Sequence, residues 1–136
     1  MTRKMTRNGA AEGFWCVLSC SRGGPLIVSS PCQQNSRLWP SEAGKPWATS
    51  ALQNNFQVLM VSQFTLHGYL AGNKPDFHLS MAPEPAKALF DNLVQRVRNA
   101  HTAPEQVQEG VFGAYMEVSL VGDGPVTLNL DSKVRK

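Results

Sequence analysis

The eleven residues Phe56–Leu66 (FQVLMVSQFTL) give the strongest strand pattern in this sequence of 136 residues. β-Branched and aromatic side chains, which favour strands, occur throughout the run. Its apolar residues are consecutive rather than alternating, which is typical of a strand covered on both faces. The run therefore predicts the central strand of a sheet.

Downstream of this strand, the sequence predicts a loop and then a helix. The loop, residues 67–78 (HGYLAGNKPDFH), contains glycine and proline, which interrupt regular structure. A helix is expected over Pro83–Ala100, because apolar residues recur there at helical spacing and share one face. These residues are Ala86, Leu89, Phe90, Leu93, Val94 and Val97. The stripe predicts a packing element that carries no catalytic side chain.

Further strands are expected on both sides of these elements. Phe14–Ser19 and Leu26–Ser29 are short apolar runs, whereas Phe112–Val121 and Val126–Asp131 alternate apolar and polar residues. Prolines and a glycine between Ser30 and Ser50 predict mostly loop. Strands followed by a helix and then by paired strands indicate one mixed α/β domain.

The composition excludes several classes of protein. A hydrophobic content of 42% with 17% charged residues is not typical of a disordered chain or a coiled coil. The longest apolar runs, Phe14–Leu18 and Val58–Val61, are much shorter than the roughly 20 residues of a membrane-spanning helix. No signal-peptide core follows the basic start of the chain. We therefore expect a cytoplasmic protein that does not contact a membrane.

Basic residues are concentrated at the two ends of the chain. Three of the thirteen lie in the first ten positions and three in the last four, which leaves seven basic and ten acidic residues between them. We expect a basic, flexible head (residues 1–13), a folded domain (14–131) and a basic tail (132–136). The body shows no basic stripe, so a broad RNA-binding face is not expected on it.

The residues that most often bind metals have no recognisable spacing here. They are Cys16, Cys20, Cys32, His67, His78 and His101. Three cysteines are an odd number and match no zinc pattern, and the histidines form no HExxH motif. We therefore expect no metal and no cofactor.

Four short motifs resemble the D-aminoacyl-tRNA deacylase family. They are SQFTL at residues 62–66, GNKPDFH at 72–78, FGAYM at 112–116 and DGPVT at 123–127. The resemblance extends from about Arg37 to Asp131. Without it, Ser62, Gln63 and Thr65 at the end of a strand would be interpreted as caps, because no generic catalytic motif surrounds them.

The resemblance implies a fold, a reaction and a set of site residues. The fold would be a single-domain α/β protein, a three-layer β/β/α sandwich with mixed sheets, in which the first hairpin of the family would be missing from the head. The protein would be a homodimer that hydrolyses the ester between a D-amino acid, or glycine, and the terminal adenosine of tRNA. Ser62, Gln63, Phe64 and Thr65 would line the catalytic pocket. Phe112 and Met116 would complete it.

Selection against L-amino acids is implied for one turn of the partner subunit. Gly124 and Pro125, joined by a cis peptide bond, would enter the pocket and exclude an L side chain. Backbone N–H groups near Phe64 and Thr65 would stabilise the oxyanion, with Thr65 as a nucleophile being the alternative.

A second reading of the sequence is a non-catalytic or truncated relative that binds tRNA 3′ ends or a protein partner. Gly122 favours it, because the family usually has asparagine there. The intact SQFTL and GPVT motifs favour the enzyme.

Overall fold

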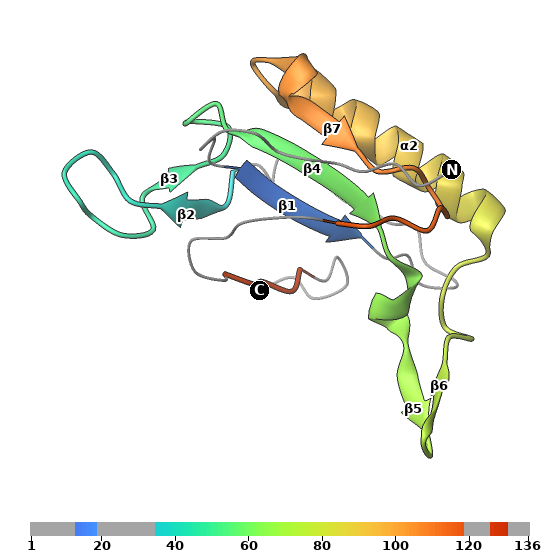
Figure 1. The fold of residues 1–136 in the computed structure, drawn as a ribbon. Helices are drawn as coiled ribbons and strands as arrows, with labels where there is room; N and C mark the ends of the chain where they lie inside the picture. The colour runs from blue at the N-terminus through green and yellow to red at the C-terminus, as the bar shows by residue number, and fades with distance from the viewer. Residues whose placement is uncertain (1–12, 19–34, 119–125, 131–136) are drawn as a thin grey trace.

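A three-stranded parallel sheet forms the centre of the protein (Figure 1). The structure is a computed structural model that describes residues 13–18, 35–118 and 126–130. The strands are β1 (Gly13–Leu18), β4 (Gln57–Ser62) and β7 (Val107–Glu109), in the order β1-β4-β7. All six residues of β4 pair with β1, and three of them pair with β7. The prediction that this run forms the central strand is confirmed.

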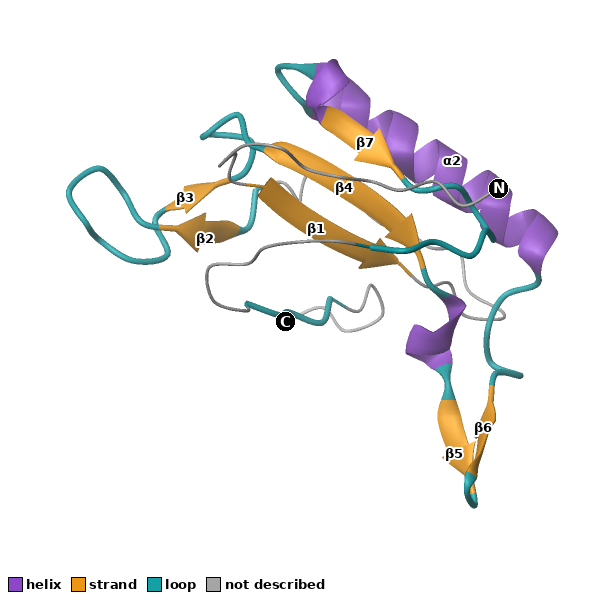
Figure 2. Ribbon diagram, in the orientation of Figure 1, coloured by secondary structure: helices purple, strands orange, loops and turns teal. Residues whose placement is uncertain are grey.

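Helix α2 (Pro83–Ala100) packs along one face of this sheet (Figure 2). It begins and ends at the residues that the sequence predicts, with Pro83 in its first turn, where the missing N–H costs nothing. The buried core joins the apolar stripe of the helix to the facing side chains of β4 and β7. Its members are Val58, Met60, Phe90, Leu93, Val94, Val97 and Val107.

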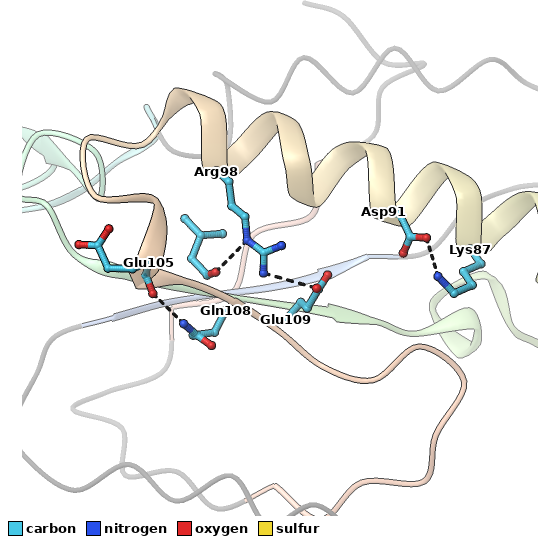
Figure 3. Close-up of polar contacts among 7 residues, drawn as sticks. Lys87, Asp91, Arg98, Glu105, Gln108 and Glu109 are labelled. Carbon is cyan, nitrogen blue, oxygen red and sulfur yellow. Dashed lines mark hydrogen bonds and ion pairs between the residues drawn. The ribbon is translucent and has the colours of Figure 1, made fainter.

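Polar contacts fasten the carboxyl half of α2 to β7. The Arg98 guanidinium donates from Nε to the Val107 carbonyl oxygen at 3.3 Å and from Nη2 to Glu109 Oε1 at 3.4 Å (Figure 3). After the helix, the buried His101 side chain lies 3.1 Å from the Phe56 carbonyl oxygen through Nε2. Since the Ala103 N–H donates to His101 Nδ1, this histidine has a structural role.

Two small antiparallel hairpins extend from opposite ends of the parallel sheet (Figure 1). One pairs β2 (Arg37–Trp39) with β3 (Thr49–Ser50), and the other pairs β5 (Tyr69–Ala71) with β6 (Lys74–Asp76). The expectation of loop structure over 30–50 and 67–78 was therefore wrong in part. Gly72, with φ of +65°, makes the tight turn between β5 and β6 possible.

The predicted central strand is also shorter than expected. It ends at Ser62 rather than Leu66, and a 3₁₀ helix, η1 (Phe64–His67), follows. Ser62 pairs with Leu18, the last residue of β1, so strand pairing with this neighbour stops at that point. The chain then turns, and the Leu66 N–H donates to the Gln63 carbonyl oxygen.

The strand expected over Phe112–Val121 is absent from its described part, residues 112–118, apart from a bridge at Val118. The third strand of the sheet is β7 instead, preceded by the 3₁₀ helix η2 (Pro104–Gln106). Gly113 has φ of +70°, and the Ala114 N–H donates to the Val111 carbonyl oxygen, so the chain turns where an extended strand was expected.

The last predicted strand was wrong as well in the part that the structure describes. Residues 126–130 have no regular structure, and Val126, Leu128 and Leu130 are exposed. No described strand pairs with this segment, so its alternating pattern has no partner to cover it. The strand expected over Leu26–Ser29 lies outside the described residues.

Candidate active site

The SQFTL segment lies at the carboxyl end of the central strand. Ser62 is the last residue of β4, Gln63 is extended with φ of −148°, and Phe64 begins η1. Ser62 and Gln63 are half-buried, whereas Phe64 and Thr65 are exposed. The carboxyl edge of a parallel sheet is where open α/β proteins bind their ligands. Phe64 and Thr65 are therefore open to solvent at this edge, with Ser62 and Gln63 partly covered beside them.

Hydrogen bonds hold this segment in one conformation. The Gln63 side-chain Nε2 donates to Thr65 Oγ1 at 2.5 Å, and Ser80 Oγ donates to the Phe64 carbonyl oxygen at 3.0 Å. The Thr65 carbonyl oxygen accepts from the Gly68 N–H at 2.9 Å. The Thr65 hydroxyl is thus held by an amide rather than by a basic group.

A ring contact joins the site to the β5–β6 hairpin. The rings of Phe64 and Phe77 meet edge to face with centroids 5.0 Å apart. A Cβ atom at Gly68 would lie only 2.6 Å from Phe77 Cε1, so the chain has no room for a side chain at this position. The base of the hairpin is therefore packed tightly against η1.

The other two predicted pocket residues follow β7 and lie in different surroundings. The Gly110 N–H donates to the Met60 carbonyl oxygen at 2.8 Å, and Met116 packs over Gly110 close to Val61. Met116 is thereby brought to the carboxyl end of β4. Phe112 instead packs against Phe90, with the two ring centroids 5.8 Å apart. It also lines an open groove of about 510 Å³ at the start of α2.

A cluster of polar side chains on the hairpin was not predicted from the sequence. The Asp76 carboxylate accepts from the His78 backbone N–H at 2.9 Å and contacts His78 Nδ1 at 2.7 Å. These hydrogen bonds to His78 lower the pKa of Asp76 below its ordinary value, and a hydrogen bond from Tyr69 acts in the same direction. The same hydrogen bond to Asp76 raises the pKa of the Tyr69 hydroxyl. The spacing Asp-x-His is the signal that would have indicated this cluster.

The proposed selectivity residues, Gly124 and Pro125, lie outside the described residues. Within the part of the chain that the structure describes, no group of three or more histidine, cysteine, aspartate or glutamate side chains is arranged to hold a metal ion. No helix in that part is long and apolar enough to cross a membrane.

The fold and the site define a small α/β protein with an exposed segment beyond the carboxyl ends of its parallel strands. Comparison with known proteins identifies the family. Residues 32–131 match the family model described as D-Tyr-tRNA(Tyr) deacylase, and the chain belongs to this family.

Individual relatives agree with this assignment. The chain is 47% identical over 98 residues to D-aminoacyl-tRNA deacylase 1 of Bos taurus, which is 72% of this chain and 46% of the relative. It is 46% identical over 100 residues to D-aminoacyl-tRNA deacylase of Dictyostelium discoideum, which is 73% of this chain and 66% of that protein. The matched segment thus spans between about half and two thirds of the length of these relatives.

Solved structures support the same fold. A protein named c-Myc DNA Unwinding Element Binding Protein superposes with a TM-score of 0.76 at 38% identity, covering 84% of this chain and 78% of that one. A probable eukaryotic D-amino acid tRNA deacylase superposes with a TM-score of 0.69 at 17% identity, covering 83% and 80% of the two chains.

Proposed function

We propose that this protein hydrolyses the ester bond of D-aminoacyl-tRNA, and of glycyl-tRNA as a secondary substrate. The observation that carries the proposal is the position of Ser62–Thr65 at the carboxyl end of the central strand, with Phe64 and Thr65 exposed, in a chain of the deacylase family. The names of the relatives support the same substrate class. The protein would act in the cytoplasm, where tRNA is charged.

In this mechanism the terminal adenosine and the ester lie against Ser62–Thr65. A water oxygen attacks the ester carbonyl carbon, the bond to the ribose oxygen breaks, and the released proton goes to that oxygen. The backbone N–H of Thr65 stabilises the oxyanion, since such donors act without a charged side chain. An aminoacyl ester is already activated, and the neighbouring 2′-hydroxyl assists. The contact between Gln63 and the Thr65 hydroxyl supports a role for Thr65 other than nucleophile.

A second copy of the chain completes the pocket in this proposal. Phe64 and Leu66 are 57% and 56% exposed, and apolar side chains at such an edge favour cover by another molecule. Gly124 and Pro125 of the partner, joined by a cis bond, would leave room for hydrogen at the substrate α-carbon but not for an L side chain. Each subunit would have the three-layer β/β/α sandwich of the family, and Met116 would line the pocket, whereas Phe112 packs against Phe90 instead.

The test is hydrolysis of D-tyrosyl-tRNA, L-tyrosyl-tRNA and glycyl-tRNA by the full chain, with sedimentation to measure the oligomeric state. We expect the D-ester to be cleaved, the glycyl ester to be cleaved more slowly and the L-ester to survive. The Gly124→Ala variant should lose activity because a Cβ crowds the position that excludes L side chains. Equal rates on both enantiomers would contradict the mechanism. Binding of tRNA without cleavage would favour the non-catalytic alternative.

A further inference from the structure

The β5–β6 hairpin is an arm that extends from the candidate active site away from the sheet (Figure 1). The strand register places four of its residues on one face. Tyr69 is paired directly with Asp76, and Ala71 directly with Lys74. Since directly paired residues and residues two apart in a strand share a face, Tyr69 and Lys74 lie on the same side of the arm. The face thus carries an aromatic ring and an ammonium group.

The ring of Tyr69 lies on the same face as its cross-strand partner Asp76. The Asp76 carboxylate raises the pKa of the Tyr69 hydroxyl, contacts the His78 ring and accepts from the His78 backbone N–H. The side chain of Tyr69 nevertheless remains 47% exposed. An exposed aromatic ring is suited to stacking against a nucleobase, and stacking of this kind tolerates any base.

One positive charge on the same face, that of Lys74, is available to an anionic partner. Lys74 is exposed and has no ion pair among the described residues. Asp76 is the one acidic residue of the arm, and its carboxylate contacts the backbone N–H and the ring Nδ1 of His78. His78 directs Nδ1 to Asp76, while its side chain is 81% exposed. Lys74, Asp76 and His78 line one open groove of about 450 Å³.

We propose that this face of the arm binds the single-stranded 3′ end of tRNA, with a base stacked on Tyr69 and a phosphate held by Lys74 and His78. The inference rests on the proposed function, because it supplies the nucleotides next to the adenosine in the site. The arm is joined to the site by the packing of Phe77 against Gly68 and Phe64. A strand held by the arm therefore reaches the site in a fixed orientation.

The test measures binding of uncharged, fluorescently labelled tRNA by the full chain across a range of salt concentrations. Lys74→Glu should weaken binding and reduce the slope of log affinity against log salt by about 0.7, the value for one phosphate contact to a single strand. Tyr69→Ala should weaken binding by about fivefold to a hundredfold, the range for one lost stacked base. Lys74→Arg should retain binding, because it keeps the charge.

The matched control is Lys45→Glu, which makes the same change of charge in the exposed loop between β2 and β3, at the opposite end of the sheet. It should bind tRNA as the wild type does, and thermal unfolding will identify any variant that fails to fold. Equal weakening by Lys45→Glu and Lys74→Glu, or no weakening by either, would overturn the role of the arm.

The two proposals fail in different ways. If the wild type binds tRNA through Lys74 but cleaves no ester, tRNA binding by the arm is supported and the hydrolase proposal is contradicted. If the wild type cleaves D-tyrosyl-tRNA while the Lys74 and Tyr69 variants bind tRNA as well as the wild type does, the hydrolase proposal is supported and tRNA binding by the arm is contradicted.

Discussion

Gly68 joins η1 to β5, and replacing it with alanine tests whether packing at this point holds the candidate site in place. The added Cβ would lie 2.6 Å from Phe77 Cε1 and 2.9 Å from the Thr65 carbonyl oxygen. Carbon atoms in contact are separated by about 3.5–4.0 Å, so the Phe77 ring has to move by about 1 Å. The φ of Gly68 is −73°, which alanine adopts readily, so the expected cost is steric.

The expected loss of stability can be estimated from the contacts that the Phe77 ring loses. Its edge-to-face contact with Phe64 is worth about 0.5–1.5 kcal/mol beyond the area it buries. Forcing an extra carbon into a packed site costs about 1–3 kcal/mol. We therefore expect Gly68→Ala to lower the free energy of unfolding by about 2 kcal/mol, measured by urea titration. Hydrolysis of D-tyrosyl-tRNA should fall as well, because Phe64 loses its neighbour.

Two further variants separate steric crowding from a general effect of alanine. Gly44→Ala, in the loop between β2 and β3, introduces a Cβ with no atom within 4 Å at a residue whose φ is +76°. This variant should lower the free energy of unfolding by about 1–2 kcal/mol, because alanine is strained in the left-handed backbone conformation. Hydrolysis should be unchanged. In the double variant Gly68→Ala/Phe77→Leu, the smaller side chain makes room for the Cβ. The double variant should therefore lose less stability than the sum of the two single variants. Additive losses would refute the steric argument.

Three other predictions concern the hairpin, the site and the core. Asp76→Asn should lower the pH at which Tyr69 ionises, measured by ultraviolet titration in a Tyr115→Phe background that leaves Tyr69 as the one tyrosine. Because the pKa of Asp76 is lowered by folding, its contribution to stability is present at neutral pH and is lost as the pH falls through its folded pKa. Thr65→Ala should keep most of the hydrolytic activity, and a loss beyond about a thousandfold would instead show that Thr65 is the nucleophile. Met60→Ala should lower the free energy of unfolding by about 2–5 kcal/mol, because Met60 is 1% exposed in the core between β4 and α2. A smaller loss would show that the core collapses around the gap.

The helix and the central strand were predictable because their own residues determine them. The apolar residues of Pro83–Ala100 recur at helical spacing, which predicts a helix with one buried face. The prolines at the start of this segment indicate where the helix begins. The apolar run of β4 is likewise buried wherever a neighbouring strand and the helix cover it. Such elements carry their burial pattern in their local sequence.

The strand expected over Phe112–Val121 was wrong in its described part, residues 112–118, because alternation alone did not decide the structure there. Phe112 turns toward Phe90, and Met116 packs back over Gly110. Both side chains are half-buried, whereas Ala114 and Val118 share their predicted face and are exposed. A period-2 pattern predicts a strand only where another strand pairs with it, and that pairing is a tertiary property. β7, in contrast, has three residues, which are too few for a pattern to emerge.

The candidate site was predictable in part from its local sequence, and in part it depends on tertiary structure. The motif Ser62–Leu66 was located from its residue types, and its place at the carboxyl end of the central strand agrees with the predicted element. The turn after Ser62 was not predicted, because the apolar residues of η1 continue the strand pattern without a break. Phe64 and Leu66 are exposed for this reason, since a 3₁₀ helix beyond the last strand pair no longer presents them to the core.

Two apolar side chains lie exposed beyond the end of the buried strand, those of Leu66 and Phe64. Phe64 has the more contacts. Here its carbonyl oxygen accepts from Ser80 and its ring rests on Phe77, so the residue is held rigidly at the surface. Rigid presentation of an apolar group suits the binding of a ligand or a second subunit, because less conformational entropy is lost when the complex forms. The residues that weaken the strand prediction are therefore the same residues that support a function at this edge of the sheet.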